Sequence, residues 1–170
     1  SSLQAVRDRR SGGGEISIPR TEQDTPFTFV GFGTIALAVP MFILFIFLVD
    51  QSALEISTGL YIGTLVFGVV FALLAGFVFA SVAGYMAGLV GSSNNPISGV
   101  TIATILTTSL ILLWMLGSQI DFGIDTAKAG TAAATAILVG AVVACAAAIA
   151  GDNMQDLKAG HIVGATPFKQ

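Results

Sequence analysis

The sequence predicts an all-α membrane protein, a polytopic bundle with about four transmembrane helices. Hydrophobic residues make up 54% of the chain and charged residues only 10%, which gives a mean hydropathy of +0.87. A soluble domain carries about 25% charged residues, so this composition indicates the membrane class. The uncharged runs, of which the longest covers residues 56–120, greatly exceed the ~10-residue strands of a membrane barrel. Helices are therefore expected, because they satisfy their own backbone groups in lipid.

The first predicted span covers residues 27–49, and the charged residue Asp50 follows it. It is long enough, since about 20 apolar residues cross the ~30 Å hydrocarbon core. The second covers residues 56–90, about 50 Å at ~1.5 Å per residue, so it must tilt, protrude or break at a glycine. The third and fourth spans are predicted at residues 97–118 and 129–151.

Polar segments flank these spans, at residues 1–26 and 152–170. With four spans, both segments and the loop at residues 91–96 lie on one side of the membrane. Lys128 alone lies on the other side, whereas the first side holds the remaining six of the seven basic residues: Arg7, Arg9, Arg10, Arg20, Lys158 and Lys169. The positive-inside rule therefore predicts cytoplasmic ends for this multi-pass segment, in the cell or inner membrane if the source is prokaryotic.

Small residues recur at every fourth position of the second and fourth spans, and each series forms a groove along one helix face. Small residues let membrane helices approach closely, so these faces are expected to contact other helices. A second interpretation is that smooth faces let helices slide, as in alternating-access carriers. The two series are Gly68, Ala72, Gly76, Ala80, Gly84, Gly88 and Ala132, Ala136, Gly140, Ala144, Ala148.

The third span carries a stripe of hydroxyl side chains, Thr101, Thr104 and Thr108, with Ser98 one turn earlier. Threonine in a helix can donate to a carbonyl of its own helix, which would make the stripe structurally neutral. The other interpretation is a polar lining that faces a water-filled path.

A polar loop, within GLVGSSNNPISGVTIATIL at residues 88–106, separates the second and third spans. As a simple turn, Gly91 would end one helix, Asn95 would cap the next, and Pro96 would occupy its first position. As a binding site, the positive end of the third span would hold a carboxylate or polar ligand among neutral side chains. Those neighbours are Ser92, Ser93, Asn94 and Ser98.

Other function classes find little support in the sequence. No catalytic triad, HExxH or Walker motif is present, so an enzyme is not expected, and no cofactor motif occurs. His161 with Asp152 and Asp156 has no specific metal-ligand spacing, so no metal site is predicted. The net charge of −3 and the lack of a basic patch argue against nucleic acid as a partner.

Two acidic residues, Asp152 and Asp156, follow the fourth span one helical turn apart, and Lys158 comes next. If the helix continues, Asp152 extends its small-residue face and could relay a proton or cation. The alternative is that these charges are solvated residues of a loop.

Two stretches of the chain resemble the oligopeptide transporter family, which includes a yellow-stripe-like branch and prokaryotic members. They are GLVGSSNNPISGVTIATIL and GDNMQDLKAGHIVGATPFKQ, and the lead-in RTEQDTPF is also similar. Family members are several times longer, so the resemblance implies an internal segment of a prokaryotic-type transporter. It also implies proton-coupled uptake of small peptides or of metal chelates of peptide-like ligands. The implied partners are lipid, the remaining transmembrane helices, substrate and protons.

The resemblance also implies that the loop at residues 92–99 matters for the transport path. We therefore expect substrate contacts from seven residues in and after the loop: Ser93, Asn94, Asn95, Pro96, Ser98, Gly99 and Thr101. The coupling or gating candidates are Asp152, Asp156 and Lys158. The alternative function is a structural or assembly module without a transport site of its own, in which the glycine faces dock partner helices.

Overall fold

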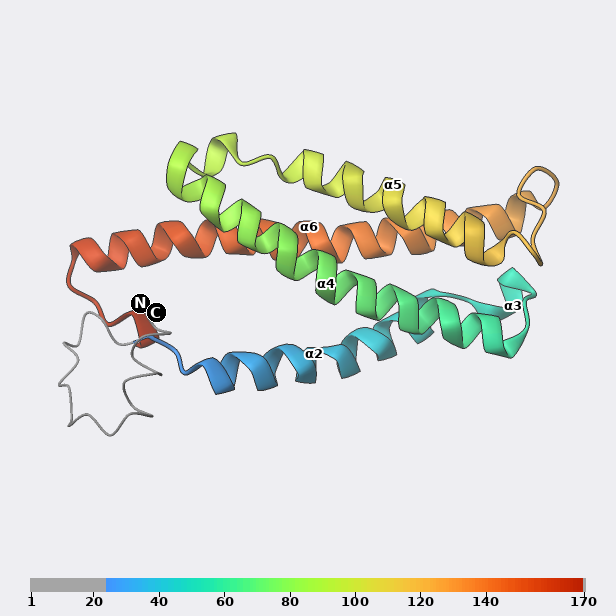
Figure 1. Cartoon of the computed structure of the whole chain (residues 1–170), viewed down its shortest axis with the longest axis horizontal. Helices are drawn as coiled ribbons and strands as arrows, with labels where there is room; N and C mark the ends of the chain where they lie inside the picture. The colour runs from blue at the N-terminus through green and yellow to red at the C-terminus, as the bar shows by residue number, and fades with distance from the viewer. Residues whose placement is uncertain (1–23, 170) are drawn as a thin grey trace, which may run out of the picture.

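Four long helices dominate the computed structural model, which describes residues 24–169 (Figure 1). No strand occurs in this range, and each long helix is long and apolar enough to cross a membrane. The all-α, four-span prediction is therefore confirmed, while the predicted N-terminal segment lies almost wholly outside the described residues. The elements are α2 (Phe27–Leu48), α3 (Gln51–Leu54), α4 (Thr58–Val90), η2 (Ser92–Asn94), α5 (Ile97–Leu116), α6 (Thr126–Ile162) and η3 (Pro167–Lys169).

The structure differs most from the predicted boundaries at the end of α6. The first three helices end within two residues of the expected positions, but α6 continues from the expected residue 151 to Ile162. The predicted span ended at residue 151, before Asp152, and the sequence left open whether the helix continues beyond it. The charged residues from Asp152 onward limit how much of the helix lipid can surround, but they do not end the helical backbone. With 37 residues, α6 is about 55 Å long.

The long helices run alternately up and down, and α4 and α6 form the central pair (Figure 1). The helix α5 packs mainly on α6, and α2 packs on α4. Figure 1 shows α4 crossing α6 obliquely, so its 33 residues are tilted relative to its neighbour. This tilt is one of the solutions expected for a span too long for an upright crossing.

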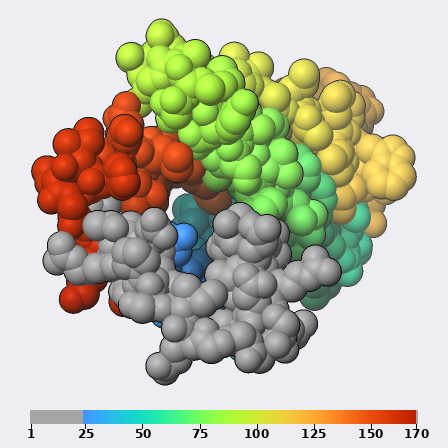
Figure 2. All heavy atoms as spheres, turned by 60° about the vertical axis from the view of Figure 1, so that its left-hand side comes forward, coloured from blue at the N-terminus to red at the C-terminus, as the bar shows by residue number. Residues whose placement is uncertain are grey.

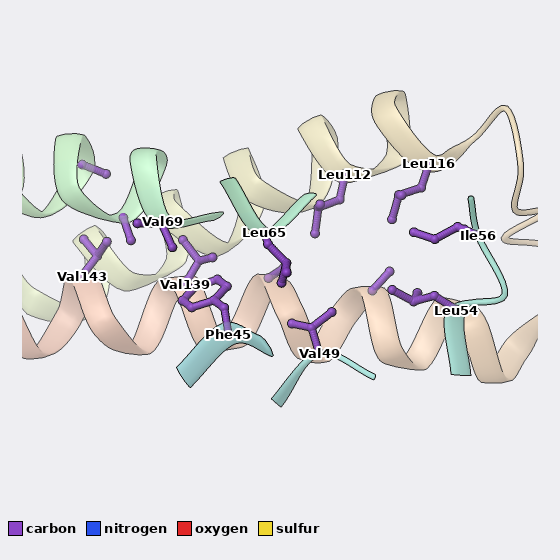
Figure 3. Close-up of a cluster of buried hydrophobic side chains, with 14 of the residues drawn as sticks. Phe45, Val49, Leu54, Ile56, Leu65, Val69, Leu112, Leu116, Val139 and Val143 are labelled. Carbon is purple, nitrogen blue, oxygen red and sulfur yellow. The ribbon is translucent and has the colours of Figure 1, made fainter. Parts of the chain in front are cut away.

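The buried core lies where the helices meet. In Figure 3, side chains from α4, α5 and α6 point toward one another, and Phe45 and Val49 approach from the end of α2. Phe45 is fully buried, yet most of α2 is exposed, including Phe32 and Phe47. Such a large apolar surface indicates a lipid or helix partner and not water.

Glycines allow the closest helix contacts. Phe45 of α2 lies directly over Gly68 of α4, and Ile105 of α5 lies directly over Gly140 of α6. Gly76 of α4 faces Ala146 of α6. The small-residue faces therefore contact other helices of this same chain, as the packing interpretation predicts.

One detail of the predicted contact face of α6 is wrong. Its buried positions pass from Ala132, Ala136 and Gly140 to a second series, Val139, Val143, Ala147 and Gly151. Ala144 and Ala148 are only half-buried. The contact face shifts because a strict four-residue repeat drifts around a helix of 3.6 residues per turn.

Hydrogen bonds and an ion pair join the connections at the end of the bundle opposite the polar loop. Gln119 accepts a hydrogen bond from the Ser57 backbone N–H at 2.9 Å and donates to its hydroxyl at 3.2 Å. Lys128 pairs with Glu55 at 3.0 Å. Asp50 accepts hydrogen bonds from the side chain and backbone of Ser52, which hold the pKa of Asp50 below its ordinary value.

The contact at Gly140 provides a test of the packing. A Gly140→Ala methyl group would collide with Ile105, and overpacking of this kind costs about 1–3 kcal/mol. We expect a lower Tm for this variant of the full-length protein in detergent, with partial recovery in Gly140→Ala/Ile105→Val. Gly130→Ala is the matched control on the same helix, because nothing lies within 4 Å of its new methyl group. Equal Tm values for the two glycine variants would contradict this packing.

Candidate functional site

The polar loop begins with a helix stop at Gly91. This glycine has φ of +82°, which L-residues with side chains rarely adopt. Its N–H donates to the Ala87 carbonyl at 3.1 Å and closes α4, as predicted from the sequence. The short turn η2 follows, and α5 begins at Ile97.

The side chain of Asn95 is turned toward α6. Its Nδ2 atom lies 2.8 Å from the position that a Cβ atom on Gly151 would occupy. The same position is 3.7 Å from the Cβ atom of Ala87. The amide therefore lies where the end of α4, the loop and α6 converge.

Both polar atoms of the Asn95 amide, Nδ2 and Oδ1, are buried and have no hydrogen-bond partner within residues 24–169. A buried amide left unpaired costs about 1–3 kcal/mol. Native proteins satisfy nearly all such groups, so each exception calls for an explanation such as an ordered water, a ligand or strain.

The expected capping role of Asn95 is wrong. The residue before α5 is Pro96, and no side chain caps this helix. Capping preferences describe a side chain and its own next turn, whereas here the amide faces another helix. The helix therefore starts without a capping side chain, and the amide stays unpaired in the described range.

The other substrate candidates surround Asn95 without sharing its burial. Ser93, Asn94, Pro96, Ser98 and Gly99 are exposed. The Asn94 amide donates to the Val90 carbonyl at 3.4 Å, so it helps to close α4. Thr101 is half-buried and donates to the Ile97 carbonyl at 2.8 Å. Asn95 is thus the one candidate whose polar atoms are both buried and unpaired in the described range.

The threonine stripe of α5 follows the structurally neutral interpretation. Thr104 and Thr108 are almost completely buried. Their hydroxyls donate to the carbonyls of Val100 and Thr104 at 2.8 and 2.7 Å. Within this segment, the prediction of a water-filled path lined by these two residues is wrong, because they pack between helices and satisfy themselves locally.

The coupling candidates lie on the C-terminal part of α6, which the sequence left open between loop and helix. This part stands out to one side of α4 and α5 (Figure 2). Asp152, Asp156 and Lys158 are helical and exposed. Asp152 directly follows Gly151, so one carboxylate is adjacent in sequence to the residue beneath the Asn95 amide.

The uncharged part of α6 indicates the depth of the site. Residues 129–151 span about 34 Å, which is close to the ~30 Å hydrocarbon core. From this length we expect Gly151 and the Asn95 amide to lie at the edge of the hydrophobic layer. From there α6 continues for about 16 Å to Ile162.

The sequence did not indicate Gly151 or Ala87 as part of the site. Gly151 is not in the predicted small-residue series, but it follows Gly140 by three full turns and therefore shares its face. This spacing from Gly140 could have indicated that Gly151 belongs to the contact face of the helix. Within residues 24–169, no group of three or more His, Cys, Asp or Glu side chains could hold a metal ion.

Comparisons with known proteins relate the whole segment to transporters. A family model described as OPT oligopeptide transporter protein matches residues 4–170. A Haemophilus influenzae protein named "Putative oligopeptide transporter" is 38% identical over 163 residues, which cover 94% of this chain and 25% of that protein. The chain therefore spans about a quarter of the length of this relative. No solved structure matches the chain.

Thiol labelling tests the burial of Asn95. Exposed thiols react with water-soluble maleimide much faster than buried ones. In the full-length protein without other cysteines, with Cys145→Ser, we expect rapid labelling of Ser93→Cys and slow labelling of Asn95→Cys. The two positions are two residues apart, so Ser93→Cys controls for access to the loop. Equally rapid labelling would show that the Asn95 side chain faces bulk water.

Proposed function

The chain belongs to the oligopeptide transporter family, and on that premise we propose that it forms part of a proton-coupled secondary transporter. Its substrates are small oligopeptides or metal chelates of peptide-like ligands. The remaining three quarters of such a transporter supply further helices, which complete the path and cover the exposed apolar faces of α2 and α5 together with lipid.

The unpaired amide of Asn95 is the observation that supports a substrate contact here. A peptide group has one carbonyl acceptor and one N–H donor. The Asn95 side chain offers the complementary pair, because Nδ2 donates and Oδ1 accepts. It can therefore bind the N–H and the C=O of one extended substrate residue, which point to the same side, through two hydrogen bonds that satisfy both buried atoms. Because neither atom is exposed to solvent in this structure, the substrate reaches them only when the loop moves away from α6.

The neutrality of this group suits its position. A charged side chain buried at this position would carry a larger desolvation cost than a neutral amide. With both ends of the segment in the cytoplasm, Asn95 lies at the cytoplasmic mouth of the path. Ser93, Ser98 and Gly99 of the exposed loop surface then complete the contact with substrate.

Asp152 is the proposed coupling residue. It lies at the end of the uncharged part of α6, where a carboxylate can exchange protons with the cytoplasm. It also directly follows the glycine beneath Asn95, so protonation and substrate binding can influence each other over a short distance. Asp156 and Lys158 follow on the same exposed helix and modulate this carboxylate by charge.

The assembly-module alternative has less support. It requires glycine faces that are free to dock partner helices. Gly76, Gly84 and Gly140 instead contact Ala146, Met154 and Ile105 of this same chain.

The two adjacent asparagines give a matched test of substrate contact. In the full-length transporter, Asn95→Leu removes both hydrogen bonds, each worth about 0.5–1.5 kcal/mol, and should raise KM for radiolabelled dialanine about tenfold or more. Asn94→Leu removes only a weak helix-end contact and should change uptake little. Membrane abundance is measured for both variants. Normal uptake with unchanged or increased stability in Asn95→Leu would show that the amide has no substrate partner.

Proton coupling is tested separately at Asp152. We expect Asp152→Asn to lose the stimulation of uptake by an inward proton gradient, because the new side chain at position 152 cannot take up a proton as the carboxylate does. Substrate exchange between equal pH values should persist, since it requires no net proton movement. Asp121→Asn, at the opposite end of the bundle, is the control. Undiminished gradient-driven uptake in Asp152→Asn would remove this residue from the coupling mechanism.

A further inference from the structure

We propose that Gly151 is a positioning residue that holds the Asn95 amide at the convergence of α4, the loop and α6. This inference rests on the proposed function for its consequence in transport, but its structural part can be tested without substrate. Gly151 is buried, and the Asn95 Nδ2 atom occupies part of the space that a side chain would need. The absence of a Cβ atom is what admits the amide.

The surroundings fix the amide from two sides. Ala87 of α4 lies across from Gly151, with its Cβ atom 3.7 Å from the same point. Both neighbours belong to long helices that contact each other extensively, so neither backbone can withdraw easily. The amide therefore has one small space between two rigid surfaces, and this space determines where its donor and acceptor lie.

Gly151 differs from the other glycines in what a methyl group would meet. At Gly140 the obstacle is the branched side chain of Ile105, close to its own helix. At Gly151 the obstacle is the outer end of an asparagine side chain, which can rotate away. Gly151→Ala should therefore move the amide without disrupting the fold, and a transport defect should appear in a protein that still folds and reaches the membrane.

A cycle of stability measurements tests the position of the amide directly. Alanine favours a helix over glycine, so Gly151→Ala should raise the Tm of the full-length protein in an Asn95→Ala background, where the space is empty. In the wild-type background it should raise Tm less or lower it, because the amide must leave. Gly130→Ala, with nothing within 4 Å, should act equally in both backgrounds. Equal Tm shifts for Gly151→Ala in the two backgrounds would overturn the proposed positioning.

Uptake of radiolabelled dialanine tests the consequence for transport. We expect Gly151→Ala to raise KM several-fold with unchanged maximal rate and membrane abundance. In the Asn95→Ala background it should add no further increase, because it acts through the amide. If the increases in KM from Gly151→Ala and Asn95→Ala were additive, Gly151 would not act through the Asn95 amide. A coupled Tm cycle with wild-type KM in Asn95→Ala would instead keep the positioning and reject the substrate contact of the proposed function.

Discussion

The close approach of α4 and α6 is the constraint on which the rest of this segment depends. Lipid offers helices little hydrophobic gain for packing against each other, so contact must come from surfaces that fit closely. Gly76 against Ala146 and Gly84 against the backbone of Ala150 provide such surfaces. Once this pair is in place, α2, α5 and the polar loop each meet it at a glycine: Phe45 at Gly68, Ile105 at Gly140 and Asn95 at Gly151.

The sequence predicted those features that the membrane itself imposes. Four helices and their approximate positions follow from the lengths of the uncharged runs, because lipid leaves the backbone little choice. The end of α6 did not follow, since the charges from Asp152 onward mark a change of solvent and not of backbone conformation. The contact face of α6 was only partly predicted, because Val139 and Val143 belong to it although they are not small.

The site was predicted less well because its properties are tertiary. Sequence patterns directed attention to the polar loop, but they named Asn94 and Asn95 alike as expected substrate contacts. In the structure, one amide bonds to the end of α4 and the other is buried without a partner in the described range. The difference arises from Gly151, which lies 56 positions later in the chain. Local preferences for caps and turns cannot register a neighbour that distant.

The order of contacts along the chain has a consequence for biogenesis. Gly76 is synthesised well before Ala146, its partner on α6. At about 5–20 residues per second, synthesis of the intervening ~70 residues takes several seconds. Throughout that interval the groove of α4 lacks its largest contact surface. The nascent segment must therefore be sheltered by the insertion machinery or by lipid until its last helix arrives.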